Sequence, residues 1–116
     1  MGWTLELSDQ AERDLAEILD HLQEAYLGFG ETPAEAVARA ALRVERIAAQ
    51  LSSLLTAPRR GTRHEDLLPD LRHLTMDRAI YWFQVDEALQ RIRILGIFFG
   101  GQEHHGKMVS RLIAGD

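Results

Sequence analysis

The sequence predicts an α+β fold with the element order βααβββ, in which a two-helix hairpin packs on one face of a small antiparallel sheet. Residues 8–26 and 32–54 repeat apolar side chains at helical spacing. Residues 71–99 hold three apolar runs separated by short polar breaks, which is the pattern of an antiparallel meander. Helices followed by a run of strands are typical of the α+β class. We expect the other face of the sheet to be partly open.

The first two elements are a strand and a capped helix. Residues 3–7 alternate apolar and polar side chains, which predicts a short strand paired with the later meander. Ser8 is a good N-cap, and Asp9 and Glu12 in the first turn suit the helix dipole. The helix is predicted to end at residues 28–30, and its apolar positions are Ala11, Leu15, Ile18, Leu19, Leu22 and Tyr26.

The second helix has a strong start signal. Thr32 is a predicted cap, Pro33 occupies the first helical position, and Glu35 completes a capping box. Pro58 is expected to end the helix. Its predicted buried stripe consists of Val37, Ala40, Ala41, Val44, Ile47, Ala48, Leu51 and Leu54.

The meander is predicted to contain strands over residues 71–76, 79–85 and 91–99. Alternation places Tyr81, Phe83 and Val85 on one face of the middle strand, and Ile80 and Trp82 on the other. The third strand becomes apolar on both faces, so we expect it at or next to the centre of the sheet. Residues 59–70 are interpreted as a polar, basic linker.

A short C-terminal tail or helix is expected over residues 102–113, after Gly100 and Gly101 break the last strand. Its apolar side would be Met108, Val109, Leu112 and Ile113. Gly106 weakens the helix prediction by about 1 kcal/mol relative to alanine.

Composition indicates an ordinary globular protein with a single domain, residues 1–116. The net charge is −5, which argues against strong non-specific binding to nucleic acid. The chain contains no cysteine, and neither a signal peptide nor a membrane span is predicted. These features fit a cytoplasmic protein.

Arginines form the first candidate binding group. The guanidinium fork suits carboxylates and phosphates, although solvated salt bridges are the plainer interpretation of each single arginine. The aromatic residues Tyr81, Trp82 and Phe83 could line a partner groove on one face of the sheet, although core packing explains them too. The arginines are Arg59, Arg60, Arg63, Arg72, Arg78, Arg91 and Arg93.

The second candidate group surrounds two adjacent histidines near the C-terminus, His104 and His105. With Lys107 they could perform acid–base chemistry on RNA, although an exposed, inert helix is the plainer interpretation. Adjacent helical residues do not face each other, so a two-histidine metal site is not expected. Neither a metal nor a cofactor is predicted.

Four stretches together resemble one family. They are LELSDQAERDLAEILDHL, AIYWFQVD, IRILGIFFGGQE, and LLTAPRRGTRHEDLLPDLRHL with its Pro58, Gly61, Arg63, Leu71 and Arg72. In this order they resemble the toxins of type II toxin–antitoxin modules in the RelE/ParE superfamily, most closely the ParE branch. The resemblance covers nearly the whole chain.

The resemblance implies a plasmid-stabilisation type of toxin that forms a hetero-oligomer with a ParD-like antitoxin. ParE-like members inhibit DNA gyrase, which would require no chemistry of the toxin itself. RelE-like members cut messenger RNA on the ribosome, often with a C-terminal tyrosine, but no aromatic residue follows Phe99 here. A non-toxic protein-interaction module is a further alternative.

The resemblance and the residue patterns lead to three sets of site predictions. Contacts with the antitoxin are assigned to Arg60, Arg63, Arg78, Trp82 and Arg93, and contacts with the target to Arg59, Arg60, Arg63, Lys107 and Arg111. If the chain is a ribonuclease, His104, His105 and Lys107 are its catalytic candidates. No direct specific DNA binding is expected, so operator recognition would belong to the antitoxin.

Overall fold

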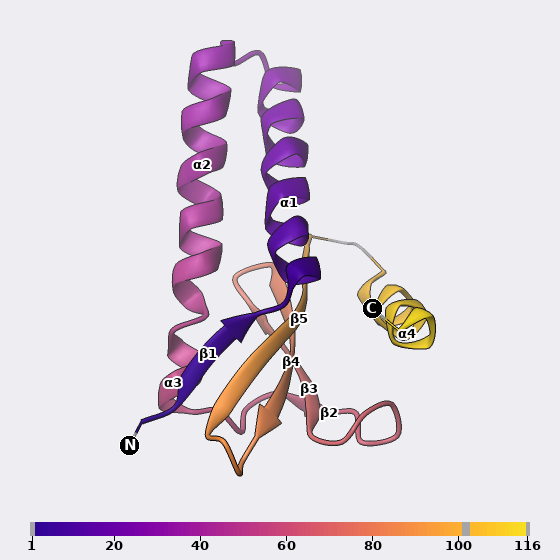
Figure 1. Ribbon diagram of the computed structural model, residues 1–116. Helices are drawn as coiled ribbons and strands as arrows, with labels where there is room; N and C mark the ends of the chain where they lie inside the picture. The colour runs from indigo at the N-terminus through magenta and orange to yellow at the C-terminus, as the bar shows by residue number, and fades with distance from the viewer. Residues whose placement is uncertain (1, 101–102, 116) are drawn as a thin grey trace.

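The computed structural model describes residues 2–100 and 103–115, within which a helical hairpin, a five-stranded sheet and a C-terminal helix form three layers (Figure 1). Gly101 and Gln102, at the predicted exit from the last strand, lie outside the described residues. The elements are β1 (Thr4–Leu7), α1 (Asp9–Gly28), α2 (Pro33–Gln50), α3 (Ser53–Thr56), β2 (Thr62–Arg63), β3 (Leu71–Met76), β4 (Ala79–Asp86), β5 (Arg91–Phe99) and α4 (His104–Ala114).

The strand order is β1-β5-β4-β3-β2, so β5 lies next to the centre, as predicted. Strands β2 to β5 pair antiparallel, but β1 pairs parallel with β5 and makes the sheet mixed. Two parallel strands must be joined by a long connection, and the helical hairpin is part of the connection between β1 and β5. The two-residue strand β2 lies inside residues 59–70, which were predicted only as a linker, and it pairs with β3.

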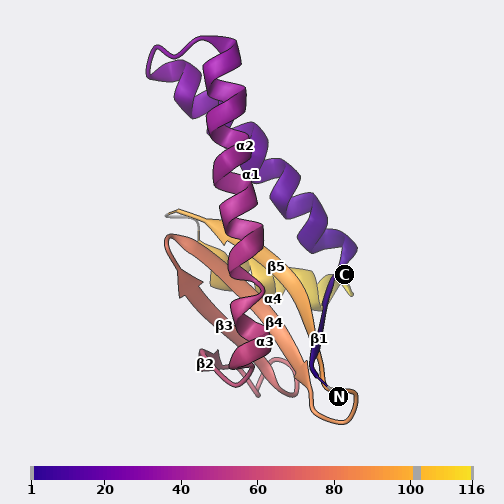
Figure 2. The ribbon, with the colours of Figure 1, turned by 90° about the vertical axis from the view of Figure 1, so that its left-hand side faces the viewer.

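Both predicted helix caps are confirmed. The Ser8 hydroxyl accepts a hydrogen bond from the Ala11 N–H at 3.1 Å. At the start of α2, the Thr32 hydroxyl accepts from the Glu35 N–H at 3.2 Å, and the Glu35 carboxylate accepts from the Thr32 N–H at 3.1 Å. The two helices form a hairpin, and its connected end projects beyond the sheet (Figure 2).

The second helix does not run unbroken to Pro58. It ends at Gln50, and the short helix α3 follows. The hydroxyls of Ser52 and Ser53 donate to the carbonyls of Ala49 and Gln50, both at 2.8 Å. Serine side chains that bond to nearby carbonyls compete with the regular helical pattern, which accounts for the interruption.

The first core lies between the hairpin and the sheet. Tyr81, Phe83 and Val85 lie on one face of β4, as predicted, and this face is the one that packs against the hairpin. The predicted buried stripe of α2 is only partly correct. Ala40 and Ile47 are buried, as predicted. Val37, Ala41 and Ala48 were predicted to be buried but are exposed, and Ala36, which was not predicted, is buried. The start of α2 projects past the sheet, so only the narrow stripe facing α1 is covered there.

The second core lies between the sheet and α4, on the face that was expected to be partly open. Ile80 and Trp82 lie on the opposite face of β4 from Tyr81, as predicted, and they are buried in this second core together with Met108 of α4. Ile113 was assigned to the apolar side of this helix, but it is 82% exposed. No helix within the described residues is long and apolar enough to cross a membrane.

Candidate functional site

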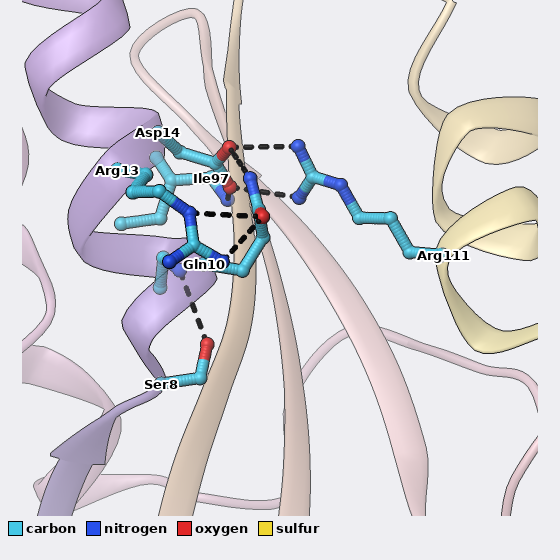
Figure 3. A network of polar contacts seen from close by, with 7 residues as sticks. Ser8, Gln10, Arg13, Asp14, Ile97 and Arg111 are labelled. Carbon is cyan, nitrogen blue, oxygen red and sulfur yellow. Dashed lines mark hydrogen bonds and ion pairs between the residues drawn. The ribbon is translucent and has the colours of Figure 1, made fainter. Parts of the chain in front are cut away.

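Helix α4 is held on the sheet by one buried carboxylate, that of Asp14 in α1 (Figure 3). Its side chain is only 2% exposed. Arg111 of α4 donates to both carboxylate oxygens, at 2.8 and 2.7 Å, and the Ile97 N–H of β5 donates to one of them at 2.9 Å. The Gln10 amide adds a hydrogen bond at 3.1 Å. This network joins α1, β5 and α4 at a single point.

The close approach of α4 depends on Gly96 in β5. A Cβ atom at this position would lie 2.9 Å from Nη1 of Arg111 and 3.3 Å from Sδ of Met108. The Arg111 guanidinium also lies over the Phe98 ring, 4.7 Å from its centroid. The C-terminal helix is therefore packed in place and is not a loose tail.

This packing gathers four histidines around one tryptophan. We call the group the histidine–tryptophan cluster and define it as His64, His73, Trp82, His104 and His105. All four imidazole centroids lie 4.6 to 5.9 Å from the centroid of the Trp82 ring. The histidines also contact one another: the centroids of His73 and His104 are 5.1 Å apart, and those of His64 and His105 are 5.6 Å apart. The His64 Nε2 and His73 Nδ1 atoms are 2.7 Å apart, which is a hydrogen bond.

Strand register places His73 in the cluster. Asp77 and Arg78 form a two-residue turn between β3 and β4, and both have positive φ angles, 52° and 71°. This is the backbone of a tight hairpin turn whose length fixes the pairing of the flanking strands. Met76 therefore pairs with Ala79, and His73 pairs with Trp82.

His64 enters the cluster from the position directly after β2, the strand next to β3. Gly61, just before β2, has a φ of 96°, and a Cβ atom there would lie 2.4 Å from the His73 carbonyl oxygen. The His64 N–H donates to the Leu71 carbonyl at 2.8 Å, which continues the pairing of β2 with β3. Because residue 61 is a glycine, the backbone before β2 can approach β3 closely, and this places His64 in contact with His73.

Electrostatics favour the neutral form of the inner histidines. Burial lowers the pKa of His64, and the neighbouring His105 lowers it further. Burial also lowers the pKa of His73, with His64 as the next cause. The Trp82 indole N–H donates to Nδ1 of His104 at 3.1 Å, so the proton of neutral His104 is on Nε2. Such imidazoles can accept, donate and relay protons.

The sequence identified half of the histidines in this cluster, His104 and His105. It did not identify His64 and His73, although the two-residue turn already implied that His73 faces Trp82. Lys107 is exposed on α4, whereas Arg111 is engaged by Asp14. Within residues 2–100 and 103–115, no group of three or more His, Cys, Asp or Glu side chains could hold a metal ion.

The arginines predicted to bind the antitoxin are spread over the sheet. Arg63 pairs with Arg72 at the start of β3, and Arg78 lies in the turn after the end of β3. Arg60 donates to the Ser53 hydroxyl at 2.9 Å. Trp82, in the same predicted set, is fully buried beneath α4.

Three exposed arginines among the predicted antitoxin and target contacts are paired with exposed acids. Arg59 forms a two-point pair with Glu87, with both distances 2.7 Å, and Arg63 pairs with Glu65 at 2.6 Å. Arg93 lies 3.5 Å from Glu6. The plainer interpretation, solvated salt bridges, therefore describes these arginines in the free chain.

Comparison with known proteins identifies the fold. No protein-family model and no curated protein matches the sequence. A chain from the chromosomal ParDE toxin–antitoxin system of P. aeruginosa matches with a TM-score of 0.65 and 23% identity, over 84% of this chain and 96% of that one. The chain has the RelE/ParE toxin fold. A free mutant of the E. coli toxin RelE also matches, with a TM-score of 0.60 and 13% identity, over 98% of this chain and 97% of that one.

A third solved structure supports the same assignment. The RelBE2 toxin–antitoxin complex of Mycobacterium tuberculosis matches with a TM-score of 0.51 and 15% identity, over 85% of this chain and 99% of that one. The predicted RelE/ParE architecture is confirmed by these comparisons. On this RelE/ParE fold, the histidine–tryptophan cluster lies on the sheet face opposite the hairpin.

Proposed function

We propose that this chain is the toxin of a type II toxin–antitoxin module, neutralised by a ParD-like antitoxin with which it forms a hetero-oligomer. The observation that carries this proposal is the fold match, which spans 96% of the chain from the ParDE system and 97% of the RelE chain. Operator binding is assigned to the antitoxin, because the toxin is acidic overall and its sequence holds no DNA-reading motif.

We propose DNA gyrase as the target. The sequence resembles the ParE branch most closely, and gyrase inhibition requires only a complementary surface. The exposed cations Arg59, Arg63 and Lys107 are the contacts assigned to this surface. The net charge of −5 also disfavours an enzyme that must sit among RNA phosphates.

Ribosome-dependent cleavage of messenger RNA is the second candidate, and the histidine–tryptophan cluster favours it. Cleavage needs a base to activate the 2′-hydroxyl and an acid for the leaving group. His105 is exposed, and it contacts the ring of His64, which is hydrogen-bonded to His73. His104 and His105 lie on helix α4, which is packed on the sheet and so holds them on a supported element.

One experiment separates the candidates. The chain is first expressed alone and together with the product of the adjacent gene; growth arrest that the second protein relieves is the expected result. Purified chain is then added to gyrase supercoiling assays and to translating ribosomes. Loss of supercoiling with intact messenger RNA supports gyrase as the target.

Histidine variants sharpen that comparison. His104→Ala/His105→Ala should leave gyrase inhibition unchanged if the chain only binds its target. His21→Ala on the exposed side of α1 is the matched control. Messenger RNA cleavage that the double variant abolishes and the control retains would assign the chain to the ribonucleases. Growth that continues unaffected on induction would support a non-toxic interaction module.

A further inference from the structure

A hollow of about 660 Å³ lies where the projecting hairpin leaves the sheet. Its walls come from the end of α1, the middle of α2, the β3–β4 turn and the end of β5. Its volume is within the range of about 300–1,000 Å³ that is typical of small-molecule sites. The histidine–tryptophan cluster contributes none of its lining residues, so the hollow is separate from that group. We refer to it as the hairpin hollow.

The hairpin hollow is cationic, although the whole chain carries a net charge of −5. Among the described residues that line it, four are arginines and one is an aspartate. Arg39, Arg43 and Arg46 lie on one face of α2, at the i, i+4 and i+7 positions. Arg78 joins them from the β3–β4 turn. A concave, positively charged surface of this kind raises the local concentration of anions.

Part of this positive charge is not neutralised by the chain itself. Arg39 pairs with a glutamate in the α1–α2 connection, and Arg43 contacts Asp77 through its carboxylate at 3.4 Å and its carbonyl at 2.8 Å. Within residues 2–100 and 103–115, Arg46 and Arg78 form no ion pair, and both are exposed. An anion can therefore bind these two guanidiniums without displacing an acid of the chain.

The end of the hollow near the α1–α2 connection is aromatic. The Arg39 guanidinium lies over the Tyr26 ring there, 4.2 Å from its centroid. Phe29 lies three residues after Tyr26, lines the hollow and is 80% exposed. Among the residues that the structure describes, no ring or guanidinium stacks on Phe29. Its ring therefore offers an open, flat apolar face beside the arginines.

The aromatic end and the cationic end are separated by a defined length. Arg46 lies seven residues after Arg39 in α2, which is about 10 Å along the helix axis. Arg43, between them, contacts Asp77 in the β3–β4 turn, so Arg78 of the same turn also lies at the sheet end of the hollow. The arrangement fits a ligand with a planar ring system at one end and an anionic group at the other, such as a nucleoside diphosphate.

We propose that the hairpin hollow binds a nucleoside diphosphate, with the base stacked on Phe29 and the phosphates held by Arg46 and Arg78. A guanidinium matches phosphate oxygens through two parallel N–H donors. Stacking on an aromatic ring suits every base, so nucleotides with different bases should bind alike. The inference adds a small-molecule site to the chain, and it depends neither on the antitoxin nor on the target of the proposed function.

The test titrates the purified chain with ADP in a calorimeter. Pyrophosphate and adenosine are the matched probes, because each keeps one end of the ligand. ADP should bind at least about fivefold more tightly than pyrophosphate, since only ADP gains the stacking contact. Adenosine should bind more weakly than ADP because it lacks the phosphates. Binding of ADP should weaken as salt is added, and GDP should bind within about fivefold of ADP.

Three variants locate the site, and each changes an exposed side chain. Arg46→Ala should weaken both ADP and pyrophosphate about tenfold or more, because it removes a charge-assisted hydrogen bond. Phe29→Ala should weaken ADP about fivefold or more and leave pyrophosphate unchanged. Arg13→Ala is the control for lost positive charge, because Arg13 does not line the hollow. Its affinity for ADP should stay within about twofold of the unsubstituted chain.

Three outcomes would overturn the proposal. Absence of ADP binding at millimolar concentration, or binding that Arg46→Ala/Arg78→Ala leaves unchanged, overturns the site. Equal binding of ADP and pyrophosphate, with no effect of Phe29→Ala, overturns the nucleotide as its ligand. A short single-stranded RNA that binds more tightly than ADP and loses affinity on Arg46→Ala would assign the hollow to nucleic acid instead. None of these measurements uses growth arrest or the antitoxin, so they leave the proposed function to its own experiment.

Discussion

Arg111 and Asp14 are 97 residues apart in the sequence, and they form the two-point ion pair that fastens the C-terminal helix to the rest of the molecule (Figure 3). Because Asp14 also accepts the Ile97 N–H of β5, one carboxylate links all three layers. The position of α4, and with it the pairing of His104 with Trp82, depends on this contact.

Removing one member of this pair should be costly. Asp14→Ala leaves the Arg111 guanidinium and the Ile97 N–H without their partner, and the expected loss is about 3–5 kcal/mol in the free energy of unfolding. The loss is measured by urea denaturation. A Trp3→Phe background makes Trp82, beneath α4, the reporter of α4 docking.

A double variant separates lost pairing from an unpaired buried charge. Asp14→Asn/Arg111→Met removes both charges, and it should be more stable than Asp14→Ala because no charge is left buried without a partner. Asp20→Ala, which removes an exposed carboxylate from the same helix, is the control and should lie within about 0.5 kcal/mol of the unsubstituted chain. A loss below about 1 kcal/mol for Asp14→Ala would show that α4 docks without the pair.

Gly61 should not tolerate a side chain. Gly61→Ala adds a Cβ atom that would lie 2.4 Å from the His73 carbonyl oxygen, at a backbone φ of 96° that L-residues rarely adopt. The expected cost is about 1–3 kcal/mol, with loss of the contact between His64 and His73. Thermal unfolding measures the cost, and histidine ring resonances in NMR spectra report the contact.

Gly28→Ala is the matched control for this substitution. A Cβ atom at Gly28 would meet nothing within 4 Å. Gly28 is the last residue of α1, and alanine is a better helix former by up to about 1 kcal/mol. The control should therefore be neutral or stabilising; equal destabilisation by both variants would mean that the close approach at Gly61 has no special cost.

The Tyr81 hydroxyl links the sheet to α2. It donates to the Ile47 carbonyl at 2.8 Å and lies 2.8 Å from Oε1 of Gln50. Burial raises the pKa of this hydroxyl above its usual range, so it stays protonated and able to donate. Tyr81→Phe should cost about 1 kcal/mol in chemical denaturation while retaining the packing of the ring. A change below about 0.3 kcal/mol would mean that water replaces the bond without loss.

Local patterns predicted the parts of the fold that depend on neighbours in sequence. Ser8 and Thr32 predict the starts of their helices, because each cap is a hydrogen bond between residues only three positions apart. The three meander strands follow from alternation and from the short breaks between them. The same reasoning reaches part of the site, because the two-residue turn at Asp77 and Arg78 fixes His73 opposite Trp82.

The remaining features depend on contacts between distant segments, which carry no local signal. The parallel pairing of β1 with β5 and the two-residue strand β2 depend on where the chain returns after the hairpin. The pairing of Asp14 with Arg111 depends on α4 lying across the sheet. Arg39, Arg43 and Arg46 stand at helical spacing on α2, but only the fold brings Arg78 of the β3–β4 turn beside them.

The inner histidines should make stability depend on pH. The pKa values of His64 and His73 are lowered below the unfolded value of 6.5, mainly by burial and then by other histidines of the cluster; Asp66 opposes this only in part for His64. The unfolded chain therefore takes up protons at a higher pH than the folded chain does. Stability from these two groups is complete above pH 6.5 and is lost as the pH falls through their folded pKa values.

The prediction is a decline in the free energy of unfolding as the pH falls from about 7.5 to about 5.5, measured by urea denaturation at a series of pH values. His64→Gln/His73→Gln should flatten this decline, because glutamine keeps hydrogen-bonding capacity without titrating. His21→Gln, an exposed histidine on α1, should keep the full slope. If the double variant fails to fold, His73→Gln alone should remove part of the slope. A double variant that folds and retains the slope of the unsubstituted chain would mean that the cluster does not set the pH dependence.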